Sequence, residues 1–222
     1  MSASAPAALP RYSFADELAS CVVHGIGIVL SIAGLATLVA FSAMVGDARA
    51  VTASAVFGTT LILLYTASTL YHSVSGEGAK RVLRTLDHIA IFLLIAGTYT
   101  PFTLIALPGA WGLGLFITIW TLAILGIALE LGVLKRFRKL AVVFYVAMGW
   151  VAMVAFKPLS ASLETGGLVL LIAGGAAYTL GVPFYLWRRL PFHHTVWHLF
   201  VLAGSVLHYL AVLLYVIPDR VA

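Results

Sequence analysis

Apolar residues fill this chain in seven long runs, and short polar or charged breaks separate them. A membrane-spanning helix needs about 20 apolar residues, because each residue rises about 1.5 Å across a hydrocarbon core about 30 Å thick. Seven runs reach that length, at residues 18–43, 51–72, 84–107, 110–131, 139–156, 166–187 and 194–217. The breaks are too short for a second domain. We therefore expect an all-α integral membrane protein, a seven-transmembrane helix bundle over 18–217 that follows a short cytoplasmic N-terminal tail at 1–17.

Composition supports the same class. Hydrophobic residues make up 62% of the 222 residues and charged residues only 9%, against about a quarter charged in an ordinary soluble domain. The first residues lack the basic stretch and cleavage site of a signal peptide, so the first apolar run is expected to remain as a helix. The net charge of +5 is spread too thinly to indicate a nucleic-acid partner. We expect a multi-pass protein of the cell membrane, with membrane lipids as its surroundings.

Positive charge predicts the orientation of the bundle. With the N-terminus in the cytoplasm, the inner side holds ten of the thirteen basic residues: Arg11, Lys80, Arg81, Arg84, Lys135, Arg136, Arg138, Lys139, Arg188 and Arg189. The outer side holds Arg49, Lys157 and Arg220. Basic residues concentrate in cytoplasmic loops. The pattern therefore predicts an N-terminus inside and a C-terminus outside.

With that orientation, several polar side chains come to the same depth. The second helix ends in "TASTLYHS", which brings Ser68 and His72 to the inner boundary. The third helix starts there with Asp87 in its first turns, and the seventh starts there with His194 and His198. Ionisable groups inside a membrane are costly and tend to mark functional sites. The shared depth predicts such a site at the inner ends of these helices.

The spacing of the histidines favours a metal. His194 and His198 are four residues apart, so they share one face of a helix and can coordinate one metal ion. With His72 they supply three imidazoles, and an open position for water would complete a catalytic type of zinc site. Asp87 would orient the water or accept its proton, and Ser68 would bond a substrate oxygen. We predict Zn²⁺ on these three histidines, with Asp87 and Ser68 as catalytic residues.

Each of these residues also has a simpler interpretation. A His-x3-His pair at a membrane boundary is often interfacial polarity only. Asp87 could complement the helix dipole and pair with nearby Arg84, and Ser68 could bond the backbone of its own helix. The depth shared by separate segments favours the metal site over these alternatives.

The remaining histidines are expected outside the ligand set. His193 and His88 point to other helix faces, where solvent or headgroups would meet them. Glu130 is expected to pair with the basic loop that follows it. His208 lies deeper and is expected to be a hydrogen-bonded interior residue. His24 would support the site from behind the ligands or bond a neighbouring helix.

Four short motifs, taken together, resemble those of the bacterial hemolysin III family within the progestin and adipoQ receptor superfamily, which is related to alkaline ceramidases. They are Glu17 seven residues before His24, Ser68 four before His72, Asp87 at the start of the third helix, and His194 four before His198. The resemblance covers all seven spans, in order. It implies zinc held by three histidines near the cytoplasmic face of a bacterial inner-membrane protein. It also implies hydrolysis of lipid amides, as in the better understood relatives.

Three functions follow as hypotheses. The first is a zinc-dependent membrane hydrolase of a lipid amide or ester, whose acyl chain enters between the helices. The second is a channel or pore-forming cytolysin, as the hemolysin name implies, although the outer halves of the spans carry almost no charge to line a pore. The third is a receptor-like protein with a structural zinc. We favour the hydrolase, and the substrate and oligomeric state remain open.

Overall fold

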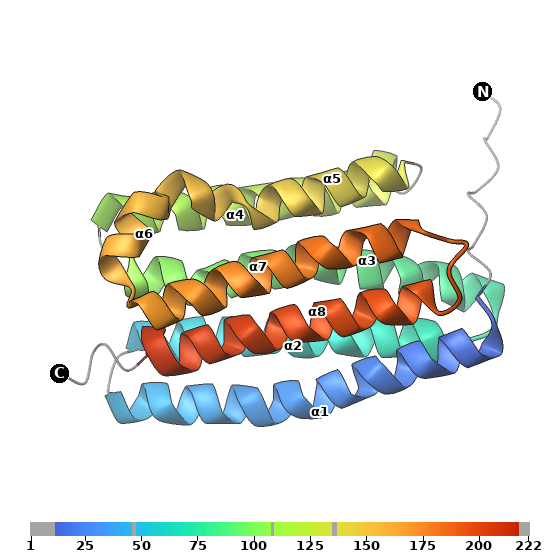
Figure 1. Ribbon diagram of the computed structural model, residues 1–222, viewed down its shortest axis with the longest axis horizontal. Coiled ribbons are helices and arrows are strands. Elements are labelled where there is room, and N and C mark those ends of the chain that lie inside the picture. The colour runs from blue at the N-terminus through green and yellow to red at the C-terminus, as the bar shows by residue number, and fades with distance from the viewer. Residues whose placement is uncertain (1–11, 46–47, 108, 135–136, 218–222) are drawn as a thin grey trace.

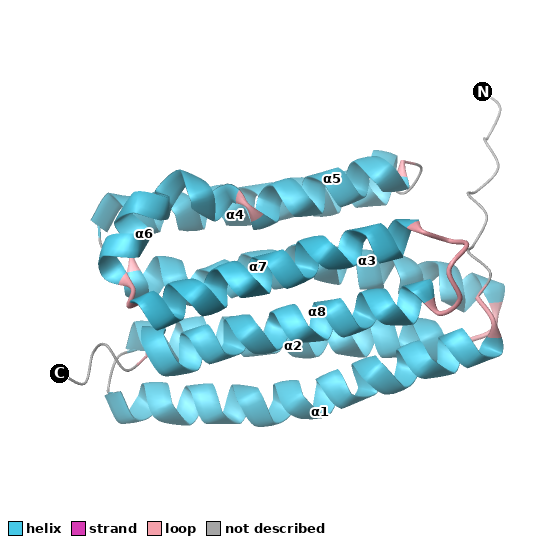
Figure 2. Ribbon diagram, in the orientation of Figure 1, coloured by secondary structure: helices cyan, strands magenta, loops and turns pink. Residues whose placement is uncertain are grey.

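The computed structural model describes residues 12–45, 48–107, 109–134 and 137–217, and it confirms the seven-helix bundle (Figure 1). Seven helical segments are long and apolar enough to cross a membrane. No strand occurs in the described part of the chain (Figure 2). The elements are α1 (Phe14–Val45), α2 (Ala48–Ser73), α3 (Glu77–Pro101) with η1 (Phe102–Ala106), α4 (Gly109–Leu129) with η2 (Glu130–Leu134), α5 (Arg138–Gly149) with η3 (Val151–Ala155) and α6 (Phe156–Ser162), α7 (Thr165–Leu186), and α8 (His193–Ala211) with η4 (Val212–Val216).

The helices pack in two groups that share α3. The larger group contains α1, α2, α3, α7 and α8, and Phe57 and Tyr65 of α2 are fully enclosed in its core. The second group sets α4 and the α5–η3–α6 segment against α3 around Phe92 and Ile119. Figure 1 shows α4, α5 and α6 as a separate layer above the others. A cavity lies between α5 and the larger group.

Two boundaries differ most from the sequence prediction. The third helix starts at Glu77, not at 84, because the charged stretch before the apolar run is itself helical. Glu77 lies in its first turn, where a negative charge complements the helix dipole. Part of the predicted break after the fifth span is the short helix α6. Helix bounds estimated from hydropathy show where the apolar, lipid-facing part of a helix ends. The helix itself can continue beyond that point.

The fifth span is broken near its middle, and Tyr99 of α3 satisfies the break. The chain passes from α5 through Trp150 into the 3₁₀ segment η3, which frees backbone groups from the regular helical pattern. The Tyr99 hydroxyl lies 3.0 Å from the carbonyl oxygen of Met148 and 2.8 Å from that of Gly149. It also accepts the backbone N–H of Ala152 at 2.9 Å. Unpaired backbone groups are energetically costly in lipid. The hydrogen bonds of Tyr99 lower that cost at the break in the fifth span.

The ends of the bundle differ in charge. Lys80, Arg81, Arg84, Arg188 and Arg189 belong to the end where α2 finishes and α3 and α8 begin, and Arg49 and Lys157 belong to the other. Arg11, Lys135, Arg136 and Arg220 lie outside the described residues, as do the side chains of Arg138 and Lys139. The predicted orientation, with the N-terminus inside and the C-terminus outside, stays a prediction.

Glycines let the helices approach closely. A Cβ atom on Gly27 of α1 would lie 2.5 Å from the buried ring of Tyr65 in α2. A Cβ on Gly25, two residues earlier, would meet no atom within 4 Å. Small residues at helix contacts are typical of membrane bundles, where packing holds helices together.

The two glycines of α1 therefore form a matched test of the packing. Gly27→Ala should destabilise the bundle by about 1–3 kcal/mol, since the enclosed Tyr65 ring has little room to move. Gly25→Ala should leave stability unchanged or raise it slightly, because alanine is the better helix former. Thermal unfolding of both variants in detergent measures the difference. Equal unfolding midpoints for the two variants would contradict the contact assigned between α1 and α2.

Candidate metal centre

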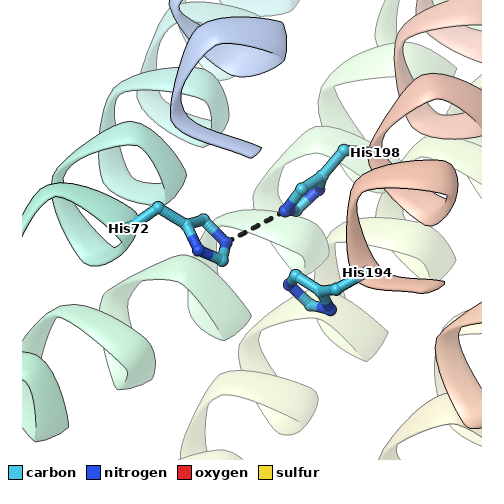
Figure 3. A group of neighbouring side chains, drawn as sticks. All are labelled: His72, His194 and His198. Carbon is cyan, nitrogen blue, oxygen red and sulfur yellow. Dashed lines mark hydrogen bonds between the residues drawn. The ribbon is translucent and has the colours of Figure 1, made fainter. Parts of the chain in front are cut away.

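Three buried histidines from two helices converge at one end of the bundle (Figure 3). His72 lies in the last turn of α2, and His194 and His198 lie in the first two turns of α8. One nitrogen from each ring falls within 4.8 Å of the others. The Nε2 atoms of His72 and His198 are 3.0 Å apart, joined by the dashed line in Figure 3. The three residues predicted from the sequence as ligands are thus brought together.

This donor set approaches the spacing that a metal ion needs, since ligand nitrogens of all three rings lie within 4.8 Å of one another. Ligand nitrogens around a tetrahedral zinc ion sit about 3.3 Å apart, given Zn–N bonds of about 2.0–2.1 Å. The two Nε2 atoms at 3.0 Å would have to separate by a few tenths of an ångström. Neutral imidazole is a common ligand for zinc and other transition metals. The cluster could therefore hold a metal ion.

Glu17 of α1 holds the ring of His72 in place. The Nδ1–H of His72 donates to Glu17 Oε2 at 2.6 Å, and Lys80 of α3 contacts Glu17 Oε1 at 2.7 Å. A proton on Nδ1 leaves the Nε2 lone pair directed at the other histidines. A carboxylate behind a ligating histidine is the usual way in which proteins fix the tautomer and ring orientation. The sequence singled out Glu17 through its spacing to His24 and did not predict this contact with His72.

Tyr12 covers the site from outside the helices. Its ring stacks on His194 with ring centres 4.6 Å apart, and its hydroxyl lies 3.2 Å from His194 Nδ1. Sequence reasoning missed this residue, because it precedes the first helix in a segment with no motif. A lone tyrosine in a tail carries no signal that it folds back over a site.

His24 lies behind the third histidine. Its ring centre is 3.7 Å from that of His198, and its edge meets the ring of Tyr65. Both of its nitrogens are buried and make no hydrogen bond. Of the two alternatives predicted for His24, this position corresponds to support of the ligands from behind.

Asp87 and Ser68 lie beside the cluster. Asp87 is 8% exposed and lines a cavity together with His194 and His198. The fully buried hydroxyl of Ser68 faces the Asp87 carboxylate without a hydrogen bond of ordinary length. Ser68 also makes no bond to its own helix backbone, which was the simpler interpretation of this serine. Neither residue belongs to the group whose ligand atoms lie within 4.8 Å of one another.

Three expectations for neighbouring residues were wrong. His88 does not face solvent: its Nδ1 lies 2.9 Å from the buried Oε1 of Glu130. Glu130 lies buried at the start of the π-helical segment η2, and the partner that the described residues give it is His88 of α3. His193 is also buried, and its Nδ1–H donates to the carbonyl oxygen of Phe184 at 3.2 Å.

A cavity of about 140 Å³ starts at the histidine cluster and runs between α3, α5, α7 and α8. Apart from the polar groups at its ends, its walls are aliphatic and aromatic, as at Ile91, Ile95, Val146 and Val182. A second cavity of about 70 Å³ continues toward the other end of the bundle. The residues lining both are Thr98, Tyr99, Gly149, Trp150, Gly175 and His208, and we call this junction the waist.

Comparisons with known proteins agree with this architecture. A sequence model described as "Haemolysin-III related" matches residues 12–209. The chain is 47% identical over 203 residues to Hemolysin-3 of Bacillus cereus, covering 91% of this chain and 93% of that protein. It is 44% identical over 204 residues to a Hemolysin-3 homolog of Bacillus subtilis (strain 168), covering 92% and 96%. A monocyte to macrophage differentiation factor of Homo sapiens is 29% identical over 205 residues, covering 89% and 83%.

The contact between Glu17 and His72 predicts an effect on metal affinity. Glu17→Gln keeps the shape of the side chain and removes the charge that fixes the imidazole. We expect zinc affinity to fall by about 10- to 100-fold, measured by competition with a chromophoric chelator in detergent.

Glu77→Gln is the matched control, because Glu77 is 83% exposed and pairs with Arg81 at 3.5 Å, away from the histidines. Its zinc affinity should equal that of the unaltered chain. Equal affinities in both variants would mean that Glu17 does not support the ligand.

Proposed function

The chain belongs to the haemolysin-III related family, and from that premise we propose that it is a zinc-dependent hydrolase of a lipid amide or ester. The observation that carries the proposal is the position of the histidine cluster at one end of a long apolar cavity. A zinc ion held there would polarise a substrate carbonyl and make hydroxide available near neutral pH. A site for soluble substrates would not need an apolar extension of this kind.

The cavity indicates what the substrate must be like. One end presents His194, His198 and Asp87, whereas most of the wall beyond them is apolar. A lipid would place its polar linkage at the histidines and its acyl chain along the cavity. Binding along the chain adds affinity and positions the carbonyl for attack.

Asp87 is the acid–base residue of this proposal. Its carboxylate lines the cavity beside two of the histidines, within a site from which bulk water is largely excluded. It would take a proton from the attacking water and return it to the leaving group. Ser68 does not line the cavity, so we assign its hydroxyl to orienting Asp87. This replaces the direct contact with a substrate oxygen predicted from the sequence.

The site would face the cytoplasm. The basic residues of the described chain gather at the end that holds the histidines, and cytoplasmic loops are enriched in lysine and arginine. The substrate would therefore be a lipid of the inner leaflet.

Because of the names of the bacterial relatives, pore formation is the second candidate function. Those relatives are called Hemolysin-3 and a Hemolysin-3 homolog. A water-filled path needs polar lining along its length, and the two cavities here are mostly apolar. A structural zinc with a receptor role is less well supported, since a closed site has four protein ligands. Among the described residues, only three nitrogens meet.

Replacement of Asp87 separates chemistry from metal binding. Asp87→Asn should lower the release of fatty acid from a ceramide or a long-chain acyl ester by at least about 100-fold, with zinc content unchanged. Glu130→Gln is the matched control, since Glu130 is also a buried carboxylate at the same end and pairs with His88 instead. Asp87→Asn with full turnover would contradict the assigned role.

Metal removal tests the reaction class. Dialysis against a strong chelator should abolish fatty-acid release, and one equivalent of zinc, but not of magnesium, should restore it. Mass spectrometry of the lipid products provides the measurement. Turnover that survives verified loss of the metal would exclude a zinc hydrolase.

A further inference from the structure

His208 carries a buried polar atom that neither the metal site nor the fold uses. It lies on α8 ten residues after His198, about 15 Å further along the helix. Its Nε2 is 3.0 Å from the carbonyl oxygen of Leu171 in α7. A carbonyl oxygen only accepts, so Nε2 carries the proton and Nδ1 is a bare acceptor. That Nδ1 atom is buried and has no hydrogen-bond partner.

The packing of the ring shows which way this acceptor faces. A Cβ atom on Gly174 of α7 would collide with Nε2 and Cδ2 of His208, so that edge of the ring lies against α7. The edge that carries Nδ1 is therefore turned away from α7. His208 is 8% exposed and lines both cavities at the waist. The ring of His208 thus belongs to the cavity wall, and its Nδ1 atom lies on the side away from α7, with almost no accessible surface of its own.

The other polar side chains around the waist are already satisfied. Thr98 donates to Leu94, Tyr99 bonds the break in the fifth span, Trp150 donates to Thr179, Thr179 donates to Gly175, and the Tyr178 hydroxyl bonds Ser205. Among the described side chains at this level, His208 alone keeps an unpaired polar atom. Buried polar groups are nearly always hydrogen-bonded, so the partner is expected to enter with a ligand.

We propose that His208 is a subsite for a hydroxyl group on a lipid chain lying in the cavity. The acceptor selects a neutral O–H donor and disfavours a carbonyl or ether, which have no proton to give. The subsite lies near the middle of a membrane-crossing helix, where headgroups do not reach. The hydroxyl must therefore be on the acyl chain itself.

The position of the hydroxyl group along the acyl chain follows from the proposed function, on which this step rests. If the carbonyl lies at the histidine cluster, the hydroxyl lies about 15 Å away. An extended chain advances about 1.1–1.2 Å per bond, judged from about 3.3–3.6 Å per three-bond residue. The hydroxyl therefore sits about a dozen bonds from the carbonyl.

Binding of hydroxylated fatty acids to the full chain tests the subsite. In detergent, 12-hydroxyoctadecanoic acid should displace a fluorescent fatty acid at about three- to tenfold lower concentration than octadecanoic acid. His208→Phe should erase that difference, because phenylalanine fills the space beside Gly174 without an acceptor. Equal affinity of the unaltered protein for both acids would mean that only water meets His208, and would overturn the proposal.

A positional series covers the case in which the His208→Phe chain does not fold. In the unaltered protein, 2-hydroxy and 17-hydroxy acids should bind no better than the plain acid, and the preference should peak near position 12. A preference independent of position would overturn the proposal. The assay records binding without turnover, so a protein that prefers the 12-hydroxy acid but hydrolyses no lipid would refute the hydrolase and leave this subsite standing.

Discussion

The hydrogen bond from His72 to Glu17 is the contact on which the candidate site depends. It joins the end of α2 to the start of α1, and Lys80 extends it to α3. With Nδ1 occupied, the Nε2 atom of His72 is left to face His198 at 3.0 Å. The start of α1 also reaches α8, where Thr195 donates to Asp16 and contacts Ser20. Helix α1 therefore supports the ligands of two other helices without supplying one itself.

The adjoining cavity distinguishes this histidine cluster from polar groups that only face lipid headgroups. Three imidazoles at a membrane boundary could be polar groups that meet headgroups. Here they adjoin Asp87 at the mouth of an apolar space that continues to the waist. The break in the fifth span adjoins this space, and Tyr99 stabilises it. The break in regular helical structure therefore coincides with the apolar cavity in which we propose that a lipid chain binds.

Much of this arrangement was predictable from the sequence, for physical reasons. Hydropathy determined the number of spans, because lipid requires long apolar helices. The four-residue spacing of His194 and His198 placed both on one face. The direction of each span then brought His72, Ser68 and Asp87 to the same end. The family relationship recognised from these motifs is confirmed.

The rest depended on how each helix is rotated and how each chain end folds. Hydropathy does not determine rotation when nearly every face is apolar. His88 was consequently assigned to solvent or headgroups and Glu130 to the basic loop, although the two side chains face each other. The packing of His24 against His198 likewise depends on how α1 is rotated. Tyr12 reaches His194 from outside any helix, where no periodic pattern exists to guide a prediction.

Zinc-edge X-ray absorption of the purified, zinc-loaded protein tests the central claim most directly. The account predicts one zinc per chain, with three imidazole nitrogens and one oxygen about 2.0–2.1 Å from the metal. That oxygen would mark the open position that hydrolysis requires. A protein that takes up no zinc, or one whose spectrum shows fewer than three imidazoles, would contradict the account.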